Sequence, residues 1–175
     1  IRQLMKETQS IKNFDFGSLK KIYSVGEPLN PEAISWGFEN FGLVINDTWF
    51  QTETGVITIT NRPGLEVKKG SMGKPLPGIE AYVVDAAGNI LPPNVEGDLV
   101  LKPDFPSLFR DYWKKNDIYL SKFNNGLYYT GDRARIDTDG YFWFISRNDD
   151  LMKVAGHLLG PFEVESVQKM ACYLH

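Results

Sequence analysis

Cysteine and histidine are scarce in this chain, whose 175 residues include one cysteine, Cys172, and two histidines. A single cysteine excludes a disulfide within the chain and is typical of proteins from reducing compartments. No apolar run approaches the roughly 20 residues that a membrane-spanning helix needs, and no signal-peptide pattern opens the chain. From these absences we expect a cytoplasmic protein without a membrane partner.

Concentrated positive charge is also lacking. The net charge is −3, from 22 acidic and 19 basic residues. Apart from doublets such as Lys68-Lys69 and Lys114-Lys115, the basic residues are scattered, which disfavours nucleic acid as a partner. The composition is 42% hydrophobic and 13% aromatic, enough to bury one sizeable core.

The most informative segment is 46–55, which reads Asn-Asp-Thr-Trp-Phe-Gln-Thr-Glu-Thr-Gly. Its β-branched and aromatic start predicts a strand, and its polar end predicts the loop that leaves the strand. The loop offers an indole that can stack on a base, hydroxyls that can bond phosphate and a carboxylate that can bind Mg²⁺. The alternative is an aromatic core strand followed by a threonine-rich turn.

A βαβ unit is expected near the start of the chain. Residues 19–25 and 43–50 have strand-like patterns and flank a helical segment. Asn30 suits the N-cap of that helix, Pro31 its first position and Gly42 its end. We therefore expect parallel strands joined by a right-handed crossover.

After Pro63 the pattern changes to short strands separated by turns, and residues 70–78 resemble a turn-rich linker. The predicted strands cover residues 79–84, 90–91, 96–102, 128–136 and 141–145. Their spacing predicts a small barrel or folded antiparallel sheet. Segment 105–123 is expected to contain one or two short helices, and segment 161–174 is expected to be a helix. The predicted fold class is thus α/β plus antiparallel β.

Several segments, in a fixed order, resemble the motifs of the adenylate-forming enzymes, the acyl-CoA synthetase and luciferase superfamily. They read Val-Gly-Glu-Pro at 25–28, the motif at 46–55, Tyr-Thr-Gly-Asp at 129–132 and Gly-Pro-Phe-Glu-Val-Glu at 160–165. The wording is most similar to the AMP-forming acetyl-CoA synthetase branch, and the resemblance covers roughly residues 19–167.

Members of this family are much longer than 175 residues. They open with a Gly-rich Ser/Thr phosphate loop followed by a lysine, and they close with a catalytic lysine. Neither element occurs in this sequence, so the resemblance implies an internal fragment. Residues 1–78 would be an α/β sheet part of the large domain and 79–148 its antiparallel β unit. Residues 149–175 would be the hinge, at Asp149, and the start of the small C-terminal domain.

The family's chemistry is attack of a carboxylate on the α-phosphate of ATP, with pyrophosphate leaving. The resemblance implies these nucleotide-binding residues: Gly26, Glu27, Pro28, Asp47, Thr48, Trp49, Gln51, Thr52, Asp132 and Arg147. Trp49 and the backbone of 26–28 would sandwich the adenine. Asp132 would bind the ribose hydroxyls, and Arg147 the ribose or phosphate. The alternatives are a turn-capping aspartate and an arginine paired with a nearby acid.

The resemblance also implies catalytic and substrate-binding roles. Thr52 would donate to the α-phosphate, and Glu53 would bind Mg²⁺. Phe50 stands where the acetate branch usually carries tryptophan and would form a short acyl pocket with Val25, although core packing is the alternative for both. Gly156 would contact CoA. ATP, Mg²⁺ and CoA are therefore the implied cofactors and substrates, with acetate, propionate or another short or medium-chain acid as the acyl group.

Two positions depart from the family pattern. Leu158 replaces an arginine aimed at the phosphates, and leucine offers neither charge nor donors. Ser146 stands where a glycine usually precedes the arginine. Three hypotheses therefore remain open: a fragment of an acetate–CoA ligase that is inactive alone, a non-catalytic remnant that binds nucleotide weakly, and a structural piece that binds nothing. An exposed half-sheet also predicts self-association.

Overall fold

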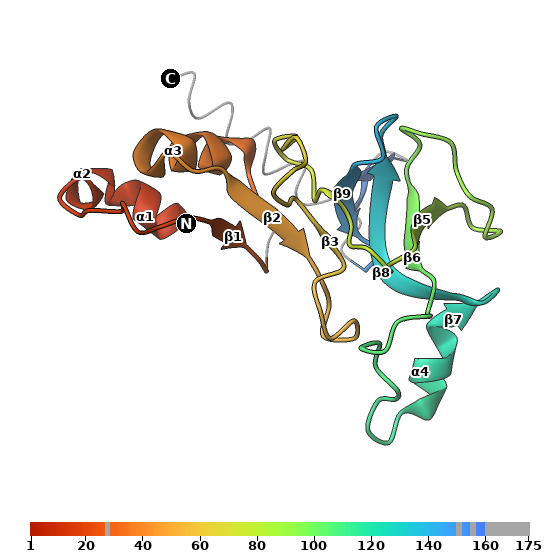
Figure 1. The fold of residues 1–175 in the computed structure, drawn as a ribbon. Helices are drawn as coiled ribbons and strands as arrows, with labels where there is room; N and C mark the ends of the chain where they lie inside the picture. The colour runs from red at the N-terminus through yellow and green to blue at the C-terminus, as the bar shows by residue number, and fades with distance from the viewer. Residues whose placement is uncertain (27–28, 150–151, 155–156, 160–175) are drawn as a thin grey trace.

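The computed structural model describes residues 1–26, 29–149, 152–154 and 157–159. The helices of this part are α1 (Arg2–Lys6), α2 (Thr8–Ile11), α3 (Pro31–Phe41) and α4 (Asn116–Ser121). The strands are β1 (Ile22–Ser24), β2 (Ile45–Trp49), β3 (Ile59–Thr60), β4 (Lys74–Pro75), β5 (Ala81–Val84), β6 (Gly97–Leu101), β7 (Phe123–Asn124), β8 (Leu127–Ile136), β9 (Phe142–Arg147), β10 (Met152–Val154) and β11 (His157–Leu159). They form a mixed sheet, a curled antiparallel sheet and a β10–β11 hairpin (Figure 1). Within the described residues, none of these helices has the length and apolar character to cross a membrane.

The expected βαβ unit is confirmed. Strands β1 and β2 pair in parallel, and α3 connects them. Asn30 caps the helix by accepting a 3.0 Å hydrogen bond from a backbone N–H two residues on, and Pro31 occupies the first position. Gly42 ends the helix with φ of +65°, a left-handed conformation that glycine adopts without steric cost. Ile34 of the helix and Ile45 of β2 are fully buried in one apolar cluster, which fixes α3 on the sheet.

Two short strands extend this sheet where the sequence suggested only a linker. Strand β3 pairs antiparallel with both β2 and β4, giving the order β1-β2-β3-β4. Gly73 has φ of +90° and lies directly against the backbone of β3. A Cβ atom on Gly73 would overlap the backbone of Thr60 and Asn61. The linker prediction for 70–78 is wrong at Lys74 and Pro75, because this close approach brings the chain into pairing distance.

The second half of the chain forms the predicted antiparallel unit. Strands β5, β6, β8 and β7 pair in that order, and β9 pairs with the far part of β8. Strand β8 is long and curls around the unit (Figure 1), and a register shift lies in each of its pairings with β6 and β9. Such irregularities increase local twist and bend a strand. The sheet thus has the form of half a barrel. The buried side chains of β8 are Tyr128, Thr130, Asp132 and Ala134.

One hydrophobic core joins the two sheets. It includes Trp49 and Ile59 from the mixed sheet and Leu99, Tyr128 and Phe142 from the curled sheet. The parts of the chain on either side of residue 78 therefore pack against each other. A smaller cluster lies between α3 and β2.

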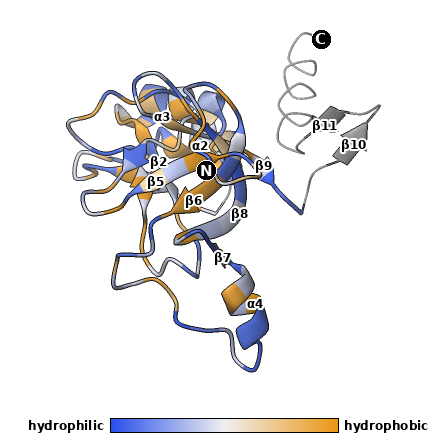
Figure 2. Cartoon of the chain, turned by 90° about the vertical axis from the view of Figure 1, so that its right-hand side faces the viewer, coloured by the Kyte–Doolittle hydropathy of each residue, from blue (hydrophilic) through white to orange (hydrophobic). Residues whose placement is uncertain are grey.

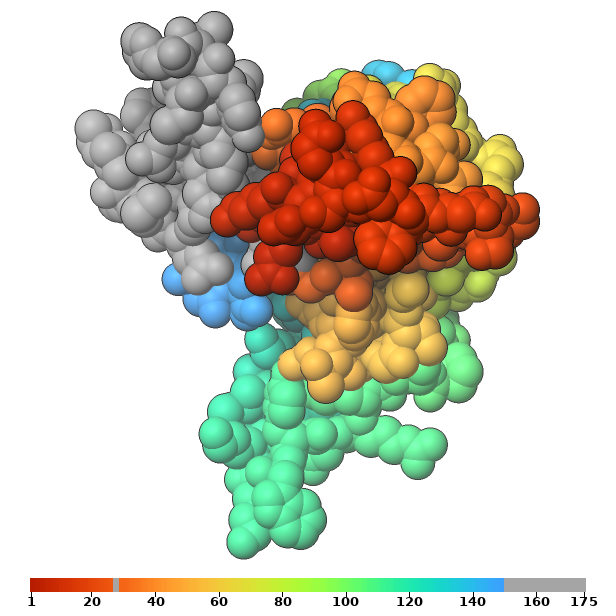
Figure 3. Space-filling view, turned by 90° about the vertical axis from the view of Figure 1, so that its left-hand side faces the viewer, coloured from red at the N-terminus to blue at the C-terminus, as the bar shows by residue number. Residues whose placement is uncertain are grey.

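Helices α1 and α2, which the sequence did not predict, lie beside α3 and cover one face of the molecule (Figure 3). The indole Nε1 of Trp36 in α3 donates a 2.9 Å hydrogen bond to Thr8 Oγ1 in α2. This contact ties the start of the chain to the βαβ unit.

The segment 105–123 contains one short helix, in line with the one or two that were expected. Only Asn116–Ser121 forms a helix, and the preceding residues are turns and irregular chain. Helix α4 and β7 project from the body of the molecule (Figure 2), and Trp113 before them is 86% exposed. The helix predicted at 161–174 lies outside the described residues.

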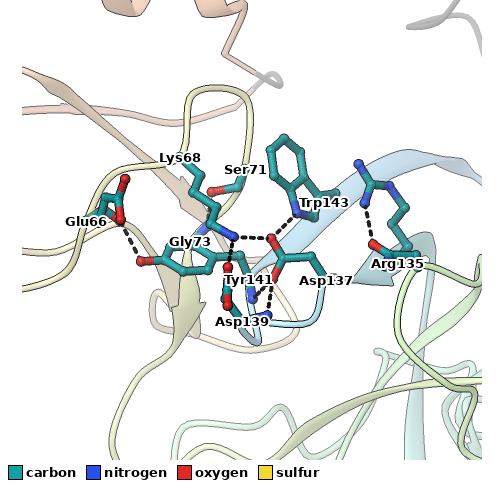
Figure 4. Close-up of polar contacts among 10 residues, drawn as sticks. Glu66, Lys68, Ser71, Gly73, Arg135, Asp137, Asp139, Tyr141 and Trp143 are labelled. Carbon is teal, nitrogen blue, oxygen red and sulfur yellow. Dashed lines mark hydrogen bonds and ion pairs between the residues drawn. The ribbon is translucent and has the colours of Figure 1, made fainter.

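A cluster of charged and aromatic side chains fastens the loop after β3 to the β8–β9 turn (Figure 4). Lys68 Nζ lies 2.7 Å from Asp137 Oδ2, contacts Asp139 as well and sits 4.7 Å from the centre of the Tyr141 ring. Trp143 Nε1 donates to the same Asp137 oxygen at 3.2 Å. Burial raises the pKa of Asp137, but hydrogen bonds from Lys68, backbone N–H groups and Trp143 outweigh it and lower the pKa to about 2.

Replacing the ammonium of this cluster should destabilise the chain. In Lys68→Met, Asp137 loses its charged partner while its side chain stays 11% exposed, so the thermal midpoint should fall. A carboxylate with a lowered pKa stabilises the fold fully above its unfolded pKa of 3.8 and loses that contribution as pH falls through about 2. The difference between wild type and variant should therefore shrink on acidification from about pH 7 to pH 2.5. Lys69→Met, whose ammonium bonds Ser35, is the control, and an equal loss in both variants would contradict a specific role.

Candidate nucleotide-binding site

The carboxylate of Asp132 is one of the points where the two sheets meet through polar groups. Trp49 Nε1 donates a 2.8 Å hydrogen bond to Asp132 Oδ2, and Gln51 Nε2 donates to the same oxygen at 3.2 Å. Asp132 is 5% exposed, and its Oδ1 accepts no hydrogen bond from the described residues. The predicted closeness of Asp132 to the motif at 46–55 is thus present, although 83 residues separate Trp49 from Asp132.

The amide of Gln51 is fixed from three directions. Besides its bond to Asp132, Nε2 donates to the carbonyl of Thr130 at 3.0 Å, and Oε1 accepts from the hydroxyl of Tyr128 at 2.9 Å. Burial and the nearby acids raise the pKa of Tyr128, so its phenol remains a donor. These bonds orient the amide nitrogen toward Asp132.

Arg147 lies opposite Asp132 in the pairing of β8 with β9. Its guanidinium bonds Asp149 through two contacts, Nε to Oδ1 at 2.9 Å and Nη2 to Oδ2 at 3.2 Å. Arg147 thus lies close to Asp132, as expected, and it also pairs with a nearby acid, which was the alternative. Burial raises the pKa of Asp132, and the Trp49 hydrogen bond and the Arg147 charge offset this only in part.

Asp47 and Thr48 are buried and hold the turn between β1 and α3. Asp47 accepts hydrogen bonds from the backbone N–H of Leu29 at 3.3 Å and of Thr48 at 3.0 Å. The Thr48 hydroxyl donates to the carbonyl of Ser24 at 2.7 Å, at the end of β1. The described contacts of both residues fix the chain that leads to Gly26. Burial raises the pKa of Asp47 to about 6.

The loop after β2 carries Thr52 and Glu53. Thr52 is exposed, while Glu53 is half-buried and accepts a 2.7 Å hydrogen bond from the hydroxyl of Tyr112 at Oε1. Burial and the Glu53 contact raise the pKa of Tyr112 to about 12. The described residues contain no group of three or more His, Cys, Asp or Glu that could hold a metal. A single carboxylate nevertheless suits Mg²⁺, which keeps water and substrate phosphates as its other ligands.

The aromatic neighbours Trp49 and Phe50 face different surroundings. Trp49 is 8% exposed and belongs to the core, so it offers an adenine ring only a small contact surface. Phe50 is 42% exposed and Val25 is 56% exposed, so neither is packed in a core of the described residues. Val25 and Gly26 line an open cavity of about 490 Å³ beside the start of α3.

Several predicted positions cannot be placed in this way. Glu27, Pro28 and Gly156 lie outside the described residues. Leu158 pairs with Lys153 in the β10–β11 hairpin. Ser146 is 1% exposed, and its hydroxyl has no hydrogen-bond partner among the described residues, which costs about 1 to 3 kcal/mol for a buried polar group.

The sequence interpretation missed Tyr112 and Tyr128. Tyr128 did carry a signal, because it shares the even-numbered face of the predicted strand 128–136 with Asp132. Tyr112 had no local signal, because its contact with Glu53 spans 59 residues and arises from loop packing.

Residues 1–113, more than half of the 175, match the family model described as AMP-binding enzyme. The chain belongs to this family. It is 49% identical over 154 residues to the acetyl-coenzyme A synthetase of Bacillus subtilis, and the aligned region covers 87% of this chain and 27% of that protein. It is 44% identical over 161 residues to the acetyl-coenzyme A synthetase of Pyrobaculum arsenaticum, covering 87% of this chain and 24% of that protein.

Solved structures show the same fold. The anthranilate CoA ligase AuaEII in complex with anthranoyl-AMP superposes with a TM-score of 0.80 at 34% identity, over 89% of this chain and 29% of that one. An acyl-CoA synthetase of Brucella canis gives a TM-score of 0.72 at 39% identity, over 91% of this chain and 29% of that one. The chain thus spans less than a third of the length of these relatives.

The raised pKa of Asp47 makes a testable contribution to stability. The folded state holds the Asp47 proton more tightly than the unfolded state, so ionisation destabilises the fold as pH rises from about 4 through about 6. Asp47→Asn removes this effect while keeping the shape of the side chain. Relative to wild type, the variant should gain roughly 2 kcal/mol of unfolding free energy between pH 4.5 and 7. Urea unfolding at both pH values measures this, and a pH-independent difference would refute the role of burial.

Proposed function

We propose that this chain supplies the adenosine-binding part of an AMP-forming acyl-CoA synthetase, with acetate–CoA ligase as the parent activity. The observation that carries the proposal is the buried carboxylate of Asp132, which accepts hydrogen bonds from Trp49 and Gln51. Arg147 lies opposite Asp132 in the strand pairing, and its charge acts on that carboxylate. The similarity to acetyl-coenzyme A synthetases supports the choice of reaction.

In this proposal Asp132 receives the ribose. Its Oδ2 is held by Trp49 and Gln51, which leaves Oδ1 to accept hydrogen bonds from the ribose hydroxyls. Arg147 donates to Asp149 beside it, and its N–H groups can instead donate to the ribose or to a phosphate. The adenine lies between the chain at 26–28 and the small part of Trp49 that stays exposed.

The phosphates lie over the loop after β2. Thr52, exposed on that loop, donates to the α-phosphate. Glu53 would hold Mg²⁺, and that ion would supply positive charge to the phosphates. The buried Asp47 and Thr48 act on the nucleotide through the turn they hold, because their described contacts are with the backbone of that turn.

The acyl group is placed between Val25 and Phe50, which are both exposed. A carboxylate oxygen of acetate attacks the α-phosphorus, the bond to pyrophosphate breaks, and acetyl-AMP results. The thiolate of CoA, positioned in part by Gly156, then attacks the acyl carbonyl and AMP leaves. Propionate and longer acids stay open, because one methylene changes discrimination by only about 1 to 3 kcal/mol.

A second candidate function is nucleotide binding without catalysis. Leu158 favours it, because the position lacks the charge and donors that an arginine would bring to the phosphates.

The organisation of the chain is also a proposal. We propose that Asp149 acts as a hinge, that the chain divides near residues 78 and 148, and that copies of the chain associate through β1. Tyr23 on β1 is 47% exposed, which is compatible with such an edge contact.

AMP binding tests the adenosine part of the proposal. Asp132→Ala should weaken AMP binding by about 10- to 100-fold, because charge-assisted bonds to two hydroxyls are lost. Asp132→Asn keeps the shape and the contacts at one oxygen, so it separates loss of charge from loss of folding. Asp117→Ala on α4 is the control. Titration calorimetry of the chain with AMP measures the effect, and equal affinities in all four proteins would refute the site.

Catalysis by the 175 residues alone should be at background. The sequence contains no Gly-rich Ser/Thr loop and carries Leu158, so positioning and charge neutralisation are both incomplete. Loss of one electrostatic contact typically costs about 10²- to 10³-fold in rate. Pyrophosphate release from ATP and acetate measures this. Acetate-dependent release that Asp132→Ala abolishes would contradict the expectation and make the missing elements dispensable.

A further inference from the structure

The irregular segment 105–112 lies against the loop that carries Thr52 and Glu53, a contact that Figures 1 and 3 show between the gold and green parts of the chain. Three hydrogen bonds join them. The Ser107 hydroxyl donates to the carbonyl of Thr54 at 2.7 Å, the Phe109 N–H donates to the carbonyl of Glu53 at 2.7 Å, and the Tyr112 hydroxyl donates to Glu53 Oε1 at 2.7 Å. Glu53 is thus held by both its backbone and its side chain.

The contact is close along its whole length. Gly55 has φ of +68°, and a Cβ atom there would lie 2.6 Å from the carbonyl oxygen of Ser107. A side chain at this position would push the two segments apart. The loop after β2 and the segment 105–112 therefore form one packed unit.

Tyr112 is itself anchored by aromatic rings. The ring of Phe109 lies 4.9 Å from that of Tyr112, 5.0 Å from that of Tyr119 and 5.6 Å from that of Tyr128. Offset and edge-to-face arrangements at these distances are favourable. Because Tyr128 also bonds Gln51, the cluster connects the surroundings of Glu53 to those of Asp132.

We propose that Tyr112 is a positioning residue for Glu53: its hydroxyl holds Oε1 so that Oε2 is presented to the metal of a bound metal–nucleotide complex. Oε2 accepts no hydrogen bond from the described residues, whereas Oε1 is occupied. Partners that orient a carboxylate ligand typically change metal affinity by about 10- to 100-fold. The proposal rests on the function proposed above, in which Glu53 holds Mg²⁺.

Binding of Mn²⁺–ATP, detected by water-proton relaxation, tests this inference on the chain. Tyr112→Phe deletes the hydroxyl and keeps the ring, so affinity for Mn²⁺–ATP should fall about tenfold while affinity for metal-free AMP stays unchanged. Tyr119→Phe is the matched control. Tyr119 belongs to the same aromatic cluster, and its hydroxyl has no hydrogen bond with the described residues. Glu53→Gln should weaken Mn²⁺–ATP binding at least as much as Tyr112→Phe.

The binding outcomes separate the two proposals. If Glu53→Gln weakens Mn²⁺–ATP binding but Tyr112→Phe does not, the role of Tyr112 is wrong and the proposed function stands. If Tyr112→Phe and Tyr119→Phe weaken binding equally, the hydroxyl contributes through packing alone, which also overturns the inference. If wild type binds neither Mn²⁺–ATP nor AMP, the proposed function fails, and the inference built on it fails too.

Discussion

The hydrogen bond between the Trp49 indole and the Asp132 carboxylate joins the two sheets of this chain at the candidate site. It links the end of β2 to the middle of β8 inside the core that both sheets share. A buried carboxylate is costly unless it is hydrogen-bonded, so this geometry is favourable only when both strands are in register. The second donor, Gln51, is in turn fixed by Tyr128 and Thr130 on β8. The fold and the candidate site therefore depend on the same few polar contacts.

Part of the fold and the site followed from local sequence signals. Asn30, Pro31 and Gly42 define the helix bounds through capping chemistry that acts within a few residues. The alternation of side chains along 128–136 indicated that Asp132 lies on the face of the strand that is buried in the core. The closeness of Trp49 to Asp132 was predicted from the resemblance of the ordered motifs to a known family. It could not come from spacing, because no spacing rule relates residues so far apart.

What the sequence did not give depends on contacts between distant segments. Strand β4 exists because Gly73 approaches the backbone of β3, which no propensity at Lys74-Pro75 indicates. The contact of Tyr112 with Glu53 arises in the irregular part of a stretch that was expected to contain one or two short helices. Aromatic packing around Phe109 decided the outcome there, because it rewards an irregular path that brings four rings together.

The motif at 46–55 divides into a part that builds the site and a part that is open to a ligand. Asp47, Thr48 and Trp49 are buried, and their polar atoms contact the chain itself. Phe50 and Thr52 are exposed. The change falls where β2 ends: its residues, Ile45–Trp49, are all buried, and Phe50 is the first residue after the strand. Substitutions in the first part should therefore act on stability and on the turn before α3. Substitutions in the second part should act on ligands with little effect on the fold, since their side chains contribute little to either core.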